Sequence, residues 1–167
     1  GGPGKSQMVA EIDAMGGVMS RAADCAGIHW RTLNATHGAA TQALRAQIDR
    51  ELYHNAIVDI LSKYEKLDIA YEHVDTLDIK SATVNDKYNA RAIILTTGTF
   101  LGGVVTRGNE KISSGRLQDD GTYQDADNNI SGILKNHGFK ILRLKTGTPA
   151  RIRKDSIDFS VCEIQPG

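Results

Sequence analysis

The sequence predicts a mixed α/β fold, with α+β left open because the pattern does not fix a topology. The strongest helical pattern covers residues 41–64, with Thr41 as the expected N-cap and one apolar stripe along its length. Residues 67–79 alternate between apolar and polar side chains, as a half-buried strand does. The run "ARAIILTTG", residues 90–98, is typical of a strand that is buried on both faces.

Shorter elements precede the 41–64 helix. Residues 5–15 predict a helix whose apolar side chains share one face, and the two glycines at 16–17 are expected to end it. Residues 18–34 alternate loosely and predict two short strands joined by a turn. The segment "ATHGAA", residues 35–40, is expected to be a loop.

The second half of the chain is less regular. Residues 80–89 predict a turn or a stunted hairpin. Residues 99–129 are rich in glycine, aspartate and serine, so we expect an exposed, mobile loop around their most polar part. A short helix is expected over 130–136, and the tail from 139 to 167 is expected to be extended and at first basic.

Composition excludes several classes of protein. The 167 residues are 40% hydrophobic and 24% charged, as in an ordinary globular domain. Twenty basic and twenty acidic side chains leave no net charge, so overall electrostatics cannot support non-specific nucleic-acid or membrane binding. Cys25 and Cys162 are too few for a disulfide framework or a zinc site, which indicates a reducing compartment. We find no membrane-spanning run and no signal peptide, and we interpret the glycine-rich start as part of a longer polypeptide.

The opening residues "GGPGKS" raise the possibility of a P-loop. Gly4, Lys5 and Ser6 match the last three positions of the P-loop pattern, but the first glycine and its preceding strand are not in the sequence. A triphosphatase also needs a hydrophobic strand that ends in an aspartate for magnesium, whereas the best strand runs into Thr96. A glycine turn that starts a helix is the favoured reading of the pattern.

The end of the 90–98 strand is the first candidate ligand site. Gly98 follows the apolar run directly, and ligands of open α/β sheets lie at the carboxyl ends of strands. A residue without a side chain would let the backbone approach a cofactor closely, although a simple strand-ending turn explains the pattern equally well.

A basic stretch is the second candidate. "RLKTGTPARIR", residues 143–153, lies within a run from Lys135 to Lys154 that contains no acidic residue. Such a stretch could bind phosphate of a cofactor or of RNA, but the pattern alone favours a solvated basic face. The histidines and cysteines form no recognisable metal or catalytic set, so no catalytic residue is assigned.

Six segments form one ordered series along nearly the whole chain: "GGPGK…EIDAMGG", "AGIHWRTLNATHG", "LRAQIDRELY", "RAIILTTGTFLGG", "SSGR" and "LKTGTPARI…SIDFSV". This series resembles the MnmG (GidA) family of FAD-dependent tRNA-modifying flavoproteins. The resemblance implies that residues 1–167 are a partial FAD-binding domain of the glutathione-reductase-like fold with inserted strands. The first strand with its G-x-G-x-x-G fingerprint would precede Gly1, and the C-terminal remainder would follow Gly167.

The resemblance also implies a function for the full-length protein. With an MnmE-type GTPase, the family installs a carboxymethylaminomethyl group on the wobble uridine of tRNA, using FAD and NADH. A homodimer in a bacterial cytoplasm or a mitochondrial matrix is implied, without membrane association. The segment alone is expected to be inactive because the main pyrophosphate anchor is absent from it.

The family's site residues carry over by position. The implied FAD-contacting residues are Gly1, Gly2, Gly4, Lys5, Val74, Thr97, Gly98, Thr99, Ser113, Gly115, Arg116 and Thr122. The implied tRNA- or phosphate-contacting residues are Lys145, Thr146, Gly147, Thr148 and Arg151.

Several positions depart from the family pattern. Ser114 and Ala150 replace a glycine and a proline, and the segment "QDDGT" replaces a Gly-Asp-Pro-Pro-Ser contact to FAD. The family's catalytic cysteine would lie just before Gly1, so neither cysteine of the chain is promoted to that role. The rival hypothesis is therefore a descendant that has lost its cofactor and serves as a structural or RNA-assembly subunit, and a P-loop nucleotidase ranks third.

Overall fold

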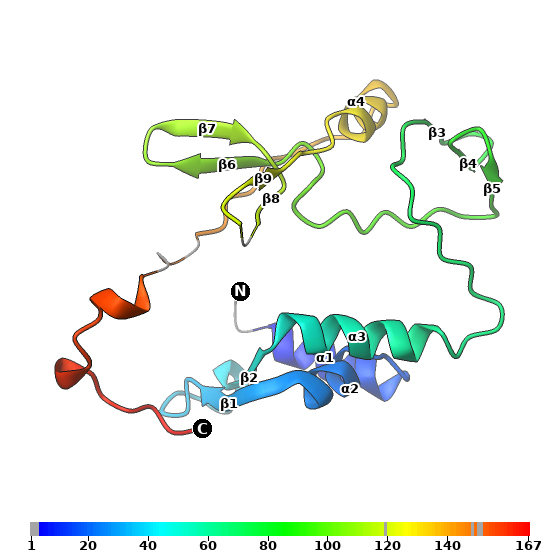
Figure 1. Ribbon diagram of the computed structural model, residues 1–167. Helices are drawn as coiled ribbons and strands as arrows, with labels where there is room; N and C mark the ends of the chain where they lie inside the picture. The colour runs from blue at the N-terminus through cyan, green and yellow to red at the C-terminus, as the bar shows by residue number, and fades with distance from the viewer. Residues whose placement is uncertain (1–3, 119, 148, 150–151) are drawn as a thin grey trace. The chain divides into compact units, whose positions relative to one another are not determined.

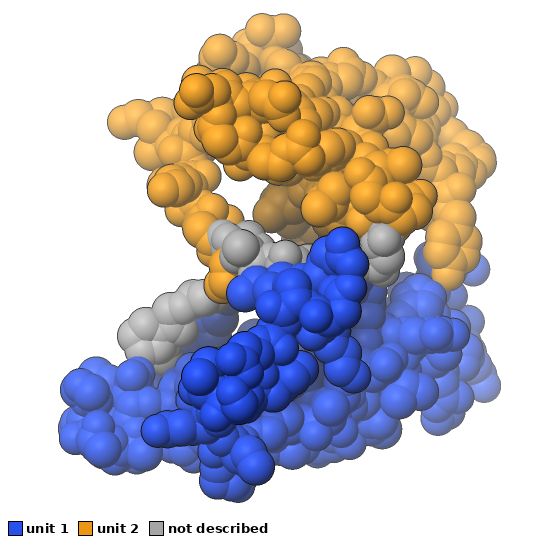
Figure 2. Space-filling model, turned by 60° about the vertical axis from the view of Figure 1, so that its left-hand side comes forward, with its two compact units in different colours: residues 1–69, 151–167 blue, residues 70–150 orange. Residues whose placement is uncertain are grey.

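The computed structural model describes residues 4–118, 120–147, 149 and 152–167. The chain divides into two compact units, which Figure 2 colours separately. Unit 1 contains Gly1–Ile69 and Arg151–Gly167, and unit 2 contains Ala70–Ala150. Both units contain helix and strand, so the prediction of a mixed fold is confirmed.

Unit 1 contains three helices, α1 (Lys5–Ala14), α2 (Met19–Ala26) and α3 (Arg50–Leu61) (Figure 1). The prediction of α1 is confirmed, and Gly16 follows the helix with φ +85°, a conformation that glycine adopts without strain. The prediction of two strands over 18–34 is wrong in its first half, because that half forms α2. Its buried alanines lie four residues apart on one helical face, and α2 packs against α3.

A two-stranded antiparallel ribbon completes the regular structure of unit 1. It pairs β1 (Gly27–Leu33) with β2 (Ala43–Ile48), and a short 3₁₀ turn at Ala39–Thr41 lies between them. Two further 3₁₀ turns, Lys154–Ser156 and Phe159–Val161, lie in the C-terminal segment.

The predicted helix over 41–64 is therefore wrong over its first third. Leu44 and Ile48 are four residues apart, a spacing that places two side chains on one face of a strand as well as of a helix. Pairing with β1 selects the strand. The helix begins only after Asp49, whose carboxylate accepts a hydrogen bond from the Leu52 amide at 2.9 Å, so the N-cap is Asp49 and not Thr41.

The described part of unit 2 contains small antiparallel sheets and one helix, α4 (Asn129–Asn136). A three-stranded sheet contains β3 (Leu77–Asp78), β4 (Thr83–Val84) and β5 (Tyr88–Asn89), and two hairpins pair β6 (Val104–Arg107) with β7 (Glu110–Ser113) and β8 (Arg116–Leu117) with β9 (Tyr123–Gln124). The predictions of α4 and of a hairpin over 80–89 are confirmed. The predicted strand over 67–79 is reduced to β3. The polar part of residues 99–129, "LQDDGTYQDADNN", is predicted as an exposed loop, but it contains β9 and the end of β8.

The predicted buried strand over 90–98 does not form. Ile94 is 85% exposed and Leu95 is 43% exposed, and within the described ranges no strand pairs with this run. A strand that is buried on both faces needs paired neighbours and covering helices, which the described residues do not supply. The buried apolar residues are few and lie in both units: Ala22, Ala26, Ala43, Leu77 and Ile130. Among the described helices, none combines the length and apolar character that a membrane crossing requires.

Candidate functional site

The glycine turn at the start of the chain opens a helix, as predicted. Gly4 is the N-cap of α1, and its carbonyl oxygen accepts a hydrogen bond from the Met8 amide at 3.2 Å. Lys5 is the first residue of the helix, and both residues are exposed. Gly1 and Gly2 lie outside the described residues. These positions belong to unit 1, and the other described positions of the predicted site lie in unit 2.

In unit 2, Thr97, Gly98 and Thr99 form a turn in which Gly98 and Thr99 are exposed and Thr97 is half-buried. The Phe100 amide donates to the Thr97 carbonyl oxygen at 3.2 Å, and Gly98 has φ +60°. A side chain at Gly98 would meet no atom within 4 Å, so the space above this glycine is open. Among the described residues, neither the Gly98 amide nor the Thr99 amide donates to a protein acceptor. The turn therefore offers main-chain donors at a position where a ligand can approach.

The Thr99 side chain joins this turn to a second one, residues 113–116. Its hydroxyl donates to the Gly115 carbonyl oxygen at 2.7 Å. Gly115 is buried, and a Cβ atom there would lie 2.0 Å from Cδ1 of Phe100. Gly103 has a comparable role, since a Cβ atom there would lie 2.3 Å from the Thr99 carbonyl oxygen. These glycines permit the two turns to contact each other.

Ser114 holds the second turn in place. Its side chain is the one buried polar side chain among the described residues, with 1% of the residue exposed. The hydroxyl donates to the Gln124 carbonyl oxygen at 2.7 Å and accepts from the Arg116 amide at 3.2 Å. The Gly115 amide donates to the same Gln124 oxygen at 3.0 Å. The backbone on either side of Gly115 is therefore tied to β9, while the Arg116 side chain stays exposed.

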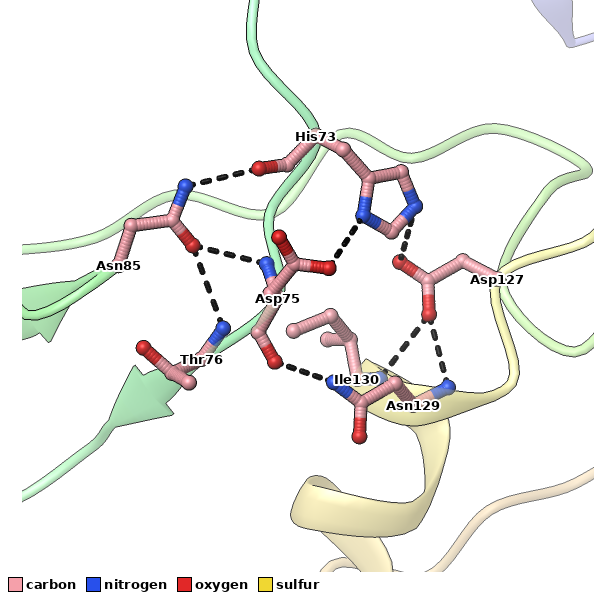
Figure 3. Close-up of polar contacts among 7 residues, drawn as sticks. All are labelled: His73, Asp75, Thr76, Asn85, Asp127, Asn129 and Ile130. Carbon is pink, nitrogen blue, oxygen red and sulfur yellow. Dashed lines mark hydrogen bonds and ion pairs between the residues drawn. The ribbon is translucent and has the colours of Figure 1, made fainter.

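Asp127 connects the first turn to α4 and to the segment around Val74 (Figure 3). Its amide donates to the Phe100 carbonyl oxygen at 2.8 Å, and its carbonyl oxygen accepts from the Gly102 amide at 2.6 Å. One carboxylate oxygen accepts from the amides of Asn129 and Ile130, the first two residues of α4, at 2.8 and 3.0 Å. The other lies 3.8 Å from Nε2 of His73.

The backbone on either side of Val74 is held by Asn85. The Asn85 side chain accepts from the amides of Asp75 and Thr76 at 2.8 and 3.2 Å, and it donates to the His73 carbonyl oxygen at 2.7 Å (Figure 3). The Asn129 side chain also donates to the Asp75 carbonyl oxygen. Val74 itself is half-buried. The structure therefore links Val74 to the Gly98 turn through the polar contacts of His73, Asp75 and Asp127.

Thr122 lies in the tight turn between β8 and β9. Its hydroxyl donates to the Asp120 carboxylate at 2.7 Å and accepts from the Gln118 side chain at 2.9 Å. The hydroxyl and the amide of Thr122 hold the pKa of Asp120 below its usual value. The Thr122 hydroxyl is thus occupied by the turn itself, so it is a poorer ligand donor than the sequence implied.

The basic stretch is extended. Lys145, Thr146 and Gly147 are exposed and belong to no helix or strand, whereas Thr148 and Arg151 lie outside the described residues. Arg143 anchors the start of the stretch, because its guanidinium donates to the Gly102 carbonyl oxygen at 2.7 Å. Residues 145–147 therefore follow a segment that is attached to the same glycine-rich turn.

Sequence reasoning missed the side chains that hold these turns together. Asp127 had a local signal, because an acidic residue just before a helix commonly satisfies its first amides. Asn85 and Ser114 had none, because Asn85 and the Gln124 partner of Ser114 contact segments that lie about ten residues away along the chain. Within the part of the chain that the structure describes, no group of three His, Cys, Asp or Glu residues could hold a metal ion, and Cys25 and Cys162 are free and exposed. The arrangement suits hydrogen bonding to a ligand better than acid–base chemistry.

Comparison with known proteins gives a consistent result. The sequence model of the family described as "Glucose inhibited division protein A" matches residues 1–167. The chain is 44% identical, over its whole length, to the tRNA uridine 5-carboxymethylaminomethyl modification enzyme MnmG of Acholeplasma laidlawii, and it covers 27% of that protein.

Two solved structures give the same assignment. They are two crystal forms of Aquifex aeolicus GidA, each 37% identical to the chain with a TM-score of 0.81, and the similarity covers 99% of this chain and 28% of theirs. The chain thus spans about a quarter of the length of these relatives. The family resemblance is confirmed: the chain belongs to the GidA, or MnmG, family.

Proposed function

We propose that the chain is part of the FAD-binding region of an enzyme that modifies uridine in tRNA. The observation that carries this proposal is the 44% identity, along the whole chain, to a relative named as a tRNA uridine 5-carboxymethylaminomethyl modification enzyme. That identity also supports an enzyme over a cofactor-free descendant. The fold of the A. aeolicus relative supports the assignment to the same part of the protein.

Unit 2 has features that fit a flavin nucleotide. The Gly98 turn offers open space and two main-chain amides without a protein acceptor among the described residues. Main chain without a side chain can approach a cofactor closely, and its amides can donate to phosphate or ring oxygens. We assign Thr97, Gly98 and Thr99 to this contact, together with Val74.

Other turns of unit 2 would take part in the same contact. Arg116 supplies an exposed guanidinium, and its backbone amide is held by the Ser114 hydroxyl. A guanidinium group pairs well with phosphate. In unit 2, Ser113, Gly115 and Thr122 shape their turns. In unit 1, Gly4 and Lys5 form a helix start, and we assign them, with Gly1 and Gly2, to the cofactor on the family resemblance alone. When bound, the flavin supplies the redox chemistry, and these residues bind and orient it.

The finer features of the full-length enzyme belong to the same proposal. NADH would reduce the flavin, an MnmE-type GTPase would be the partner, and the protein would act as a homodimer in a bacterial cytoplasm or a mitochondrial matrix. We assign Lys145, Thr146 and Gly147, with Thr148 and Arg151, to phosphate of the tRNA or of the cofactor. Their exposure supports this role.

A pair of glycine variants in the full-length protein tests the flavin site. Gly98 and Gly108 have nearly the same φ, +60° and +59°, and a side chain at either would meet no protein atom within 4 Å. Valine at either position therefore introduces similar backbone strain. Gly98→Val should lose the flavin absorbance near about 450 nm, whereas Gly108→Val, in the β6–β7 hairpin, should keep it.

The tRNA should be checked in the same experiment. Hydrolysed tRNA from cells that carry only Gly98→Val should lack the carboxymethylaminomethyl nucleoside, as measured by mass spectrometry. If both valine variants retain flavin equally, Gly98 does not contact the cofactor. If the wild-type protein neither binds flavin nor modifies tRNA, the cofactor-free alternative is supported instead.

A further inference from the structure

The β1–β2 ribbon of unit 1 carries positive charge without nearby negative charge in the sequence. Residues 27–48 contain two arginines, Arg31 and Arg45, and no aspartate or glutamate. Neither arginine belongs to any position that the flavin proposal uses. The ribbon is therefore a charged surface whose role is not explained by the site in unit 2.

The strand register places the two arginines together. Arg31 of β1 is directly opposite Arg45 of β2 in the antiparallel pair. Directly opposite residues lie on the same face of a sheet, with Cβ atoms about 4.5–5.5 Å apart. Arg45 is exposed and Arg31 is half-buried. Like charges in this arrangement repel each other, so the ribbon retains two guanidinium groups at an electrostatic cost.

Among the described residues, no acidic side chain forms an ion pair with either arginine. Arg31 donates from Nη1 to Oε1 of Gln165, a neutral partner that orients the guanidinium and leaves its charge unbalanced. Over the ranges that the structure describes, the Arg45 side chain makes no hydrogen bond or ion pair. The nearest following acid, Asp49, caps α3 through the Leu52 amide. An anion from outside the chain would therefore find both charges available.

We propose that the arginine ribbon, defined as β1 and β2 with Arg31 and Arg45 on one face, binds the phosphodiester backbone of the tRNA substrate. This inference rests on the proposed function, which makes tRNA the substrate. Two guanidinium groups on one face, Arg45 exposed and Arg31 half-buried, match a polyanion that presents successive phosphates. Two-stranded ribbons are also established elements for contacting nucleic acid. A chain with no net charge needs such a local patch to hold RNA.

The test measures tRNA binding by the full-length protein as a function of salt concentration. Arg31→Gln and Arg45→Gln should each weaken binding about tenfold. Each should also reduce the slope of log affinity against log salt by about one, because one phosphate contact is lost. Arg31→Lys and Arg45→Lys keep the charge, so they should keep the salt slope.

The matched control is Arg107→Gln. Arg107 is also an arginine on a hairpin strand, but its guanidinium pairs with Glu110 at 3.0 Å. This variant changes the net charge by the same amount and should leave tRNA affinity nearly unchanged. Circular dichroism of every variant checks that it is folded, and if one glutamine variant unfolds, the salt slope of the other decides the test.

The outcomes are distinguishable. Unchanged affinity and salt slope in Arg31→Gln and Arg45→Gln overturn the inference, and so does an equal loss in Arg107→Gln. If the two variants lose flavin and keep tRNA, the ribbon binds the cofactor's phosphates and the inference is also wrong. A wild-type protein that binds flavin but no tRNA overturns the inference while the flavin assignment survives.

Discussion

Replacing Ser114 by alanine should loosen the turn that carries Arg116. The hydroxyl is buried, donates to the Gln124 carbonyl oxygen at 2.7 Å and accepts from the Arg116 amide at 3.2 Å. In the variant, Gln124 keeps its hydrogen bond from the Gly115 amide, so the main loss is at the Arg116 amide. An unsatisfied donor in this position costs about 1–2 kcal/mol. Local opening should therefore become about tenfold more frequent.

Amide hydrogen exchange of the full-length protein, read by mass spectrometry, measures this opening. Peptides that contain Arg116 should exchange about tenfold faster in Ser114→Ala than in the wild type. Ser113→Ala is the control, because Ser113 is exposed and its hydroxyl only accepts a 3.3 Å bond from Asn128. It should change the exchange less than about threefold, since exposed substitutions cost within about 0.5 kcal/mol. Equal exchange in the two variants would refute the role of Ser114 as a lock.

Three other predictions follow from the same contacts. Asn85→Ala removes three hydrogen bonds and places alanine at φ +50°. The free energy of unfolding, measured in urea, should therefore fall by about 2–4 kcal/mol. Asn85→Gly should lower it less, because glycine adopts this φ without strain. Gly103→Ala should lower the melting temperature more than Gly98→Ala, because its Cβ atom would lie 2.3 Å from a carbonyl oxygen while Gly98 has open space. The hydrogen bonds from Thr122 lower the pKa of Asp120. They should therefore stabilise this turn fully above pH 3.8, and the stabilisation should be lost as the pH falls through the lower pKa of the folded state. Amide hydrogen exchange at Thr122, measured as a function of pH, should show this loss.

The turns of the candidate site could be predicted from the local sequence, but the hydrogen bonds between these turns could not. The glycines at 98 and 115 mark turns because their backbone requirements are local. The sequence contained no sign that the Thr99 hydroxyl reaches the Gly115 carbonyl oxygen, or that Asn85 holds the backbone around Val74. Those contacts join residues that are 16 and about ten positions apart, so they depend on the path of the chain between them.

By itself the sequence determined the family and the helices whose ends are local. The motif series identified the family, and α1 and α4 were predicted because the glycines at 16 and 138 stop each helix with a positive φ, +85° and +83°. Tertiary structure decided between helix and strand at residues 43–48, because a four-residue spacing fits both and only the hydrogen bonds to β1 choose. It likewise decided that the apolar run 92–95 stays exposed in the described chain, since burial of a strand depends on neighbours and not on its own residues.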